Sequence, residues 1–419
     1  MSTTIFNSNR VVNTSLVACF FLIFWVVFKD AFRASLLFSI PDIGMLVFIA
    51  CVVISFFAIL QGFRSIKIIR FDVFLLTYIL YSSLVTSAHS LLYNPYALTS
   101  YQILIVFSFQ CLTMLLLWYF STKSPAAFVK VTNFVVRLAL LGCILFGAIL
   151  LTLVIVDLDL VFRFYGNLLE LGIIVNPFQT SDDAIAVRYS GIFYSALNFG
   201  LFIVFSIILL FGEGAKVSRR KAALFVLLLL LVSSFNRNAF ITLAYVGGAF
   251  FLFKVGMRKN IVFPTMLFGL CFIVISLAFI VNLDGEIDQN NSFILSAHSL
   301  YSRFEIWSYW LNSLNIESVL YGYGVIAGMG EEHLYIDNGY IFMIVNSGIF
   351  SMGFLLLCVF QLTLTAAKRS GPDADLAFFL LLGLPVAMVF NNIVLDPMLM
   401  LLFFFYPIAL IKHNASNGG

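Results

Sequence analysis

Three arginines stand in or beside polar interruptions of an otherwise apolar chain: Arg188, Arg237 and Arg303. Guanidinium groups bind phosphate in bidentate fashion and stay charged when they are partly buried. An ionisable side chain at membrane depth is costly, which makes it a candidate for function. We therefore expect Arg237 and Arg303 to be catalytic and Arg188 to bind substrate. The alternative is ordinary ion pairing with carboxylates such as Asp182 or Glu305, or contact with lipid headgroups.

A single histidine, His333, lies among carboxylates in the segment EEHLYIDNGY. A histidine in such a place is a candidate general base for a hydroxyl group. Its acidic neighbours would raise the pKa of the imidazole, which works against the neutral form that a base needs. A locally hydrogen-bonded loop histidine is the alternative. His333, Glu331 and Asp337 show no recognisable metal-ligand spacing, so we expect neither a metal nor another cofactor.

Further polar and aromatic residues of the same polar stretches are expected to contact the substrate. Aromatic rings can stack on sugar faces, although such residues also anchor loops at the membrane surface. The polar break between the last two apolar runs, Asn391, Asn392 and Asp396, is expected to cap helix ends. The expected substrate-binding residues besides Arg188 are Asn198, Trp307, Tyr335, Asp337, Asn338 and Tyr340.

The composition identifies the setting in which these residues must work. Of 419 residues, 62% are hydrophobic and only 10% are charged, whereas soluble domains carry about 25% charged residues. The six cysteines all fall in apolar runs, so no disulfide framework or thiolate metal site is indicated. Nucleic-acid binding is not indicated, because the sequence has no basic stripe beyond the loops whose charge the membrane orientation explains. The sequence predicts an all-α polytopic membrane protein, since backbone groups in lipid need internal hydrogen-bond partners.

Twelve apolar segments are candidate membrane spans, in one integral membrane domain over residues 1–419. The seventh and eighth are separated only by the SFNRN break, so they form either a tight hairpin or a broken helix. Two long polar segments interrupt the apolar ones, 157–189 and 282–338. If the N-terminus is cytoplasmic, 17 of the 23 lysines and arginines lie on the cytoplasmic side. Both long segments then lie outside. The predicted spans are 12–28, 42–60, 71–92, 101–120, 133–156, 190–211, 222–234, 238–254, 261–281, 339–361, 376–392 and 396–411.

A helix is predicted within the 282–338 segment. Leu300, Phe304, Trp307, Leu311 and Leu314 form one apolar stripe at helical period. The Ser-x-x-Glu pattern of residues 302–305 suits a capping box at its start. The tryptophan indicates a helix that lies along the outer membrane surface. The chain then enters the next span near residues 337–338, either of which can cap it.

Four segments together resemble the O-antigen polymerase and ligase superfamily of bacterial inner membranes. No single motif is specific, but their order and their shared membrane side are. RYSGIFYSALNFG resembles that family's Arg–x–x–Gly…Asn element, and SSFNRNAF its Ser–Arg element with Asn236 inserted as a departure. SRFEIWSYW resembles the Arg–x–x–x–Trp helix, and HLYIDNGYIFMIVNSGIFSMG the His…Asn–x–Tyr…Gly element. The matching residues are Arg188, Gly191, Asn198, Ser234, Arg237, Arg303, Trp307, His333, Asn338, Tyr340 and Gly348.

The resemblance implies a GT-C-like helical fold with about twelve spans and an active site that faces the periplasm. It implies glycosyl transfer from an undecaprenyl-pyrophosphate-linked oligosaccharide, without metal or nucleotide sugar. A chain-length regulator and a flippase of the same pathway, besides membrane lipids, are the expected partners. Leu334 stands where ligases usually have a second polar residue after the histidine, which favours a polymerase over a lipid A–core ligase. A transporter is disfavoured, because charged residues within the spans are few and no internal repeat is evident.

Overall fold

The computed structural model describes most of the chain, and several predictions fall outside that part. Residues 42–60, His333 and Tyr335 lie outside it, as does most of the 157–189 segment. For Arg188 the backbone alone is described. The described residues are 16–28, 68–93, 98–156, 178–181, 184–193, 195–212, 217–234, 236–283, 297–323, 336–389 and 391–417.

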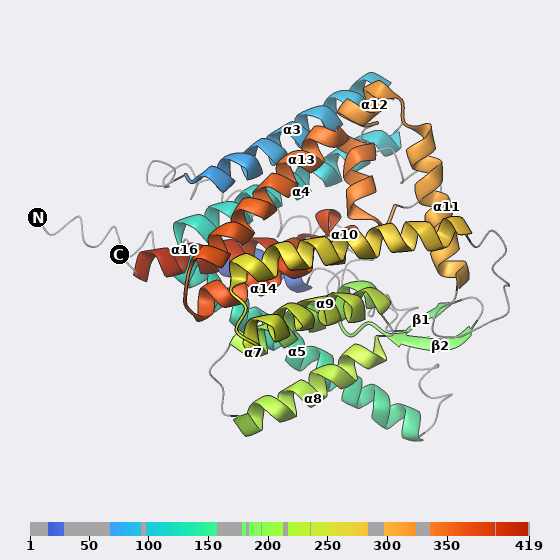
Figure 1. Cartoon of the computed structure of the whole chain (residues 1–419). Coiled ribbons are helices and arrows are strands. Elements are labelled where there is room, and N and C mark those ends of the chain that lie inside the picture. The colour runs from blue at the N-terminus through green and yellow to red at the C-terminus, as the bar shows by residue number, and fades with distance from the viewer. Residues whose placement is uncertain are drawn as a thin grey trace, which may run out of the picture.

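The described residues are helical apart from short turns and one two-stranded hairpin (Figure 1). Every predicted span other than 42–60 contains a helix, beginning with residues 16–28. The hairpin pairs β1 (Phe178–Ser181) with β2 (Ala184–Tyr189) in antiparallel fashion. The remaining helices are α3 (Arg70–Tyr93), α4 (Leu98–Lys123), α5 (Pro125–Val156), α7 (Ala196–Gly212), α8 (Val217–Ser233), α9 (Arg237–Lys254), α10 (Lys259–Leu283), α11 (Ala297–Ser313), α12 (Ile316–Tyr321), α13 (Gly339–Lys368), α14 (Pro372–Val389), α15 (Pro397–Met400) and α16 (Tyr406–Asn417).

Length and apolar composition separate the helices that can cross a membrane from shorter ones. Within the described ranges, five helices are long and apolar enough: residues 70–88, 125–149, 339–368, 372–389 and 397–415. Residues 16–28 and 196–212 form shorter apolar helices. Large apolar side chains such as Leu84 and Phe268 point outward, 72% and 76% exposed, as suits a surface covered by hydrocarbon. This is the architecture of an all-α membrane protein.

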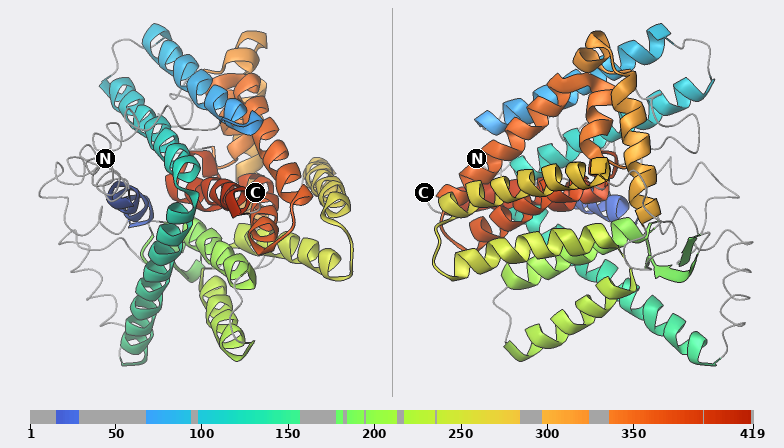
Figure 2. Two further views of the ribbon diagram at one scale, coloured as in Figure 1. Left: turned by 90° about the vertical axis from the view of Figure 1, so that its left-hand side faces the viewer. Right: turned by 45° about the vertical axis from the view of Figure 1, so that its right-hand side comes forward.

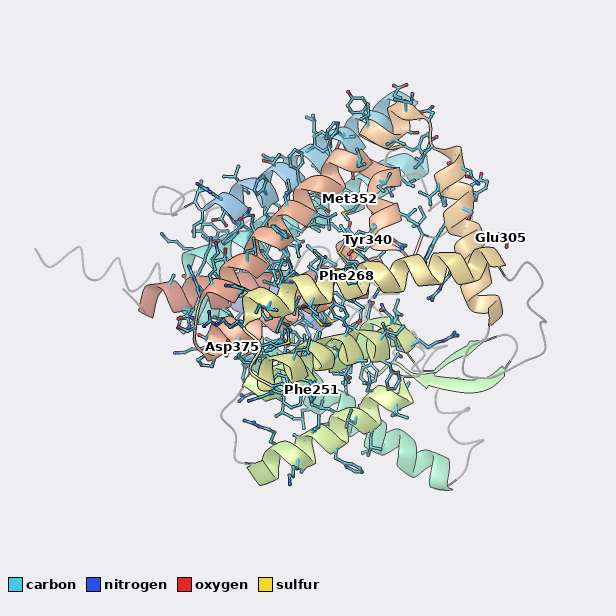
Figure 3. The ribbon with its side chains drawn as sticks, in the orientation of Figure 1. Phe251, Phe268, Glu305, Tyr340, Met352 and Asp375 are labelled. Carbon is cyan, nitrogen blue, oxygen red and sulfur yellow. The ribbon has the colours of Figure 1, made fainter. Side chains whose placement is uncertain are left out.

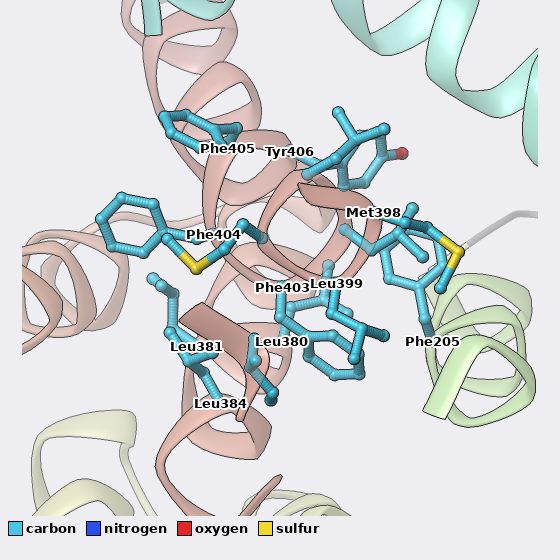
Figure 4. Packing of buried hydrophobic residues seen from close by; sticks show 14 of the residues in the cluster. Phe205, Leu380, Leu381, Leu384, Met398, Leu399, Phe403, Phe404, Phe405 and Tyr406 are labelled. Carbon is cyan, nitrogen blue, oxygen red and sulfur yellow. The ribbon is translucent and has the colours of Figure 1, made fainter. Parts of the chain in front are cut away.

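The core is built around the last helices of the chain. Residues 376–389 of α14 and residues 397–411, from α15 into α16, are apolar on all sides, which is typical of helices at the centre of a bundle. Phe205 of α7 packs against Phe403 and Tyr406, with ring centroids 6.1 and 5.5 Å apart (Figure 4). Residues 401–405 form a π-helical turn in this segment.

Helix α13 is not one straight span. Gly348 has φ +78° and ψ 173°, so the helix bends sharply there into two segments (Figure 1). Helix α12 packs directly on the bend, where the amide N–H of Tyr323 donates to the carbonyl of Val345 over 2.6 Å. A Cβ on Gly348 would lie 2.0 Å from the carbonyl oxygen of Leu320. The predicted span 339–361 lies within α13, but its helix is bent at Gly348, where glycine alone fits the backbone.

The polar segments gather at one end of the molecule. The hairpin, α11 and the first turns of α7 and α9 lie at the end opposite to the end of α16 (Figures 1 and 2). Figure 3 shows Glu305 of α11 and Asp375 of α14 at these opposite ends, with Tyr340 between them. At the Asp375 end, Lys259 pairs with Asp375 over 2.6 Å, and His413 contacts Asp373 over 2.9 Å.

Candidate functional site

Three predicted site residues are in direct contact. Arg303 and Trp307 lie one turn apart on α11, so their side chains share a face. Arg303 Nε is 2.7 Å from Asp337 Oδ2, and the indole N–H of Trp307 donates to Asp337 Oδ1 over 3.0 Å. Within the described part of the chain, Arg303 forms this pair through Nε. Its two terminal guanidinium nitrogens keep the paired donor geometry that matches a phosphate.

An apolar cluster fixes α11 to the start of α13. Trp307 is buried there with Ile336, Ile341, Phe342 and Val345. The predicted helix at 300–314 is confirmed, but its predicted start is wrong. The helix begins at Ala297, so the Ser-x-x-Glu pattern lies inside it and does not form a capping box.

Burial has the largest effect on the pKa of the Asp337 carboxylate. Loss of solvent raises its pKa above the ordinary value of 3.8, while the nearby Arg303 charge and the Trp307 hydrogen bond act in the opposite direction. Its side chain is 16% exposed, whereas that of Arg303 is 34% exposed. The pair thus lies at the border between the buried cluster and the surface.

Asn338 and Tyr340 come just after Asp337 in the sequence, and both side chains form hydrogen bonds within the protein. Asn338 caps α13 by accepting hydrogen bonds from the amides of Tyr340 and Ile341 over 2.9 and 3.0 Å. The hydroxyl of Tyr340 donates to the carbonyl of Pro385 in α14 over 2.9 Å. The predicted cap is confirmed at Asn338. These contacts position the start of α13 against α14, beside Asp337.

A seam of amides joins the first turns of α7 and α9 to the end of α14. Asn236 caps α9, accepting from the amide of Ala239, and donates to the carbonyl of Leu197 over 2.7 Å. Asn238 donates to the carbonyl of Ala387 over 3.0 Å. A Cβ on Gly200 would come within 2.5 Å of Asn236 Nδ2, so the two helix starts meet at a glycine.

Arg237 is the first residue of α9 and stands between Asn236 and Asn238 in the sequence. It is partly buried. The amino end of a helix carries a partial positive charge, so a cation placed there strengthens an already positive site. Such a position favours a negatively charged ligand.

The turn after α14 connects the two groups of residues. Asn392 donates weakly to the carbonyl of Ile336 over 3.4 Å, next to Asp337. Asp396 caps α15, accepting from Met398 over 2.8 Å, and also accepts the side-chain amide of Asn198. The predicted capping role of this polar break is confirmed for Asp396.

Arg188 lies on β2, where it pairs with Gln179 of β1. Tyr189, its neighbour, donates its hydroxyl to the carbonyl of Cys143 over 2.7 Å and fixes the hairpin to α5. The hairpin was not predicted from the sequence. Its signal is the short run AIAVRY after the polar turn SDD.

Asn236 was not predicted as a functional residue, and the structure gives it the cap of α9. Asp396 was predicted mainly as a helix cap, with a role in the site as the alternative. Asp396 precedes Pro397, an arrangement typical of a helix start, with the proline at the first helical position.

Within the described ranges, no three or more histidine, cysteine, aspartate or glutamate side chains are grouped to hold a metal ion. Comparison with models of protein families gives no match, and comparison with curated proteins gives no significant match. Function is therefore inferred from the chemistry and geometry of the residues themselves.

Proposed function

We propose that this chain is a membrane glycosyltransferase that joins undecaprenyl-pyrophosphate-linked oligosaccharide repeat units into a surface polysaccharide. The observation that carries the proposal is the contact of Arg303 and Trp307 with Asp337. Asp337 contacts the guanidinium of Arg303 at Nε, and the two terminal nitrogens have the paired donor geometry that would bind a diphosphate. Arg237 at the positive end of α9 supplies a second cation at the same end of the molecule.

In the proposed reaction, the bond between the sugar C1 and the diphosphate oxygen breaks, and the acceptor hydroxyl oxygen bonds to C1. The electron pair leaves with the diphosphate, whose growing charge Arg237, Arg303 and Arg188 stabilise. His333 accepts the hydroxyl proton. Charge stabilisation by guanidinium groups is the means by which such a departure proceeds without a metal.

The proposal includes twelve spans, a GT-C-like fold and an inner-membrane location with both long polar segments in the periplasm. The distribution of basic residues supports this orientation. The gathering of α11, the hairpin and the first turns of α7 and α9 at one end agrees with it (Figure 2).

The test is incubation of the purified protein with lipid-linked repeat units, followed by gel analysis. A ladder of chain lengths from wild type, and its loss in Arg237→Ala, is the expected result. Arg258→Ala is the matched control, because Arg258 is exposed in the turn between α9 and α10 at the other end of α9. A full ladder from Arg237→Ala would overturn the assignment.

The same preparation separates the alternatives. Transfer of glycan to lipid A–core, without a ladder from repeat units alone, would identify a ligase. Movement of labelled substrate across liposomes, without formation of a bond, would identify a transporter.

A further inference from the structure

Asp396 lies where the first turns of α7 and α15 meet, and its two carboxylate oxygens accept hydrogen bonds from different groups. Its Oδ1 accepts from the amides of Met398 and Leu399 over 2.8 and 3.2 Å and caps α15. Its Oδ2 accepts the Nδ2–H of Asn198. Each carboxylate oxygen therefore has its own described partner. The residue is buried, 9% exposed, so these contacts are shielded from water.

The contact fixes which way the amide of Asn198 faces. A carboxylate accepts hydrogen bonds and donates none, so it selects the amide nitrogen of Asn198 over the amide oxygen. The Oδ1 of Asn198 is then directed away from Asp396. Asn198 lies in the first turn of α7 and is only partly buried.

The backbone around Asn198 is held as well. Asn236 donates to the carbonyl of Leu197 over 2.7 Å and to that of Ala196 over 3.3 Å. The neighbouring Gly200 leaves the room that Asn236 occupies. The backbone position and the amide orientation of Asn198 are thus set by different residues, which is the arrangement expected of a preorganised binding group.

We propose that Asp396 is a positioning residue, which orients Asn198 so that its Oδ1 accepts a hydrogen bond from a hydroxyl group of the saccharide. This inference rests on the proposed function and names one polar contact of the same site. A sugar hydroxyl is a donor of suitable chemistry, whereas a diphosphate offers only acceptors and would be repelled by Oδ1.

The test is Asp396→Asn, assayed with lipid-linked repeat units at equal amounts of folded protein. The amide oxygen of the new asparagine can still cap α15. Its NH2 group, however, then faces the NH2 group of Asn198, and neither can accept a hydrogen bond. Asn198 must turn around to relieve this conflict, so Oδ1 no longer faces the saccharide. We expect kcat/KM to fall on the order of tenfold or more, mainly through KM, with little change in Tm.

The exchanged pair Asn198→Asp with Asp396→Asn is the rescue variant. The amide at position 396 now donates to a carboxylate at position 198, whose second oxygen again faces the saccharide. We expect activity to return toward wild type. A purely structural role for Asp396 would lower Tm and leave the activity of the folded protein unchanged in the single variant, and that result would overturn the inference.

A wild-type protein without polymerase activity would refute the proposed function, and binding of the lipid-linked saccharide then tests Asp396 separately. Weaker binding by Asp396→Asn, at unchanged Tm, would support the positioning role. Equal binding by the variant and wild type, or no binding by wild type, would overturn it.

Discussion

Arg303 and Asp337 form an ion pair between α11 and the residue before the cap of α13, with 2.7 Å between Nε and Oδ2. The pair joins a surface helix to the start of a bundle helix. Trp307 donates to the other oxygen of the same carboxylate, so the orientation of Asp337 is fixed from two sides. An orientation set this way directs the guanidinium of Arg303 before any substrate arrives.

The first prediction concerns Arg303→Lys. Lysine keeps the positive charge but lacks both the Nε contact and the paired terminal donors. In the proposed polymerisation, we expect turnover to fall about tenfold to a hundredfold. Tm should change little, because a pair with one third of the arginine exposed contributes little stability.

Arg258→Lys is the control for this change, since Arg258 is exposed at the other end of α9. Its turnover should match wild type. Equal turnover for Arg303→Lys and wild type would show that Arg303 contributes charge alone.

The second prediction is a pH dependence set by Asp337. Burial raises its pKa above 3.8, so protonation begins at a higher pH than for an ordinary aspartate. Below that pKa the carboxyl is neutral and no longer holds Arg303 as an ion pair. We expect kcat/KM to fall as the pH drops through this value, in a profile measured from neutral to acidic pH.

Stability should move in the opposite direction. The folded state binds a proton more tightly than the unfolded state, because the folded pKa is the higher one. The contribution of Asp337 to the free energy of unfolding therefore decreases as pH rises from the ordinary pKa to the folded one. Asp337→Asn should remove both dependences. Retention of the acidic limb of kcat/KM in that variant would assign the limb to another group.

The sequence predicted helices well where periodicity and local caps decide them. The stripe from Leu300 to Leu314 gave α11, and Asn338 was foreseen as a cap. The SFNRN break does separate two helices, since α8 ends at Ser233 and α9 begins at Arg237 with Asn236 as its cap. These features depend on neighbours within one or two helical turns, which a sequence displays directly.

Features that depend on distant partners were not predictable in the same way. The bend at Gly348 exists because α12 occupies the space where a Cβ would lie, and the sequence shows only a glycine in an apolar run. The contact between Asn198 and Asp396 joins residues from α7 and the turn before α15. An apolar run predicts a span but not its bend, because hydropathy carries no information about which helix packs where.

The third prediction uses two glycines of α13. Gly348→Ala places a Cβ 2.0 Å from the carbonyl oxygen of Leu320, at φ +78°. The clash and the left-handed backbone should destabilise the protein by more than about 2 kcal/mol. Thermal unfolding in detergent measures the loss.

Gly353→Ala is the matched control on the same helix. A Cβ there meets nothing within 4 Å among the described residues. Alanine favours a helix over glycine by up to about 1 kcal/mol, so Tm should stay equal or rise. A similar fall of Tm in both variants would mean that the bend is not the cause.

The last prediction concerns the ion pair of Lys412 with Asp72, which joins α16 to α3. The lysine Nζ is 2.8 and 2.9 Å from the two oxygens of Asp72 and 2.9 Å from Thr122 Oγ1. Trp118 donates to the same carboxylate over 2.8 Å. Both charged side chains are buried, so neither can be hydrated if its partner is removed.

Lys412→Met should therefore lower the free energy of unfolding by about 3–5 kcal/mol, since it leaves the buried carboxylate of Asp72 without its cation. Adding Asp72→Asn should recover part of this loss, because the amide still accepts from Trp118 and carries no charge. Lys368→Met is the control, an exposed lysine in the last turn of α13. Folded Lys412→Met should keep its turnover, since the pair lies far along the bundle from α11. A double variant as unstable as the two single losses added together would show that the two charges do not interact.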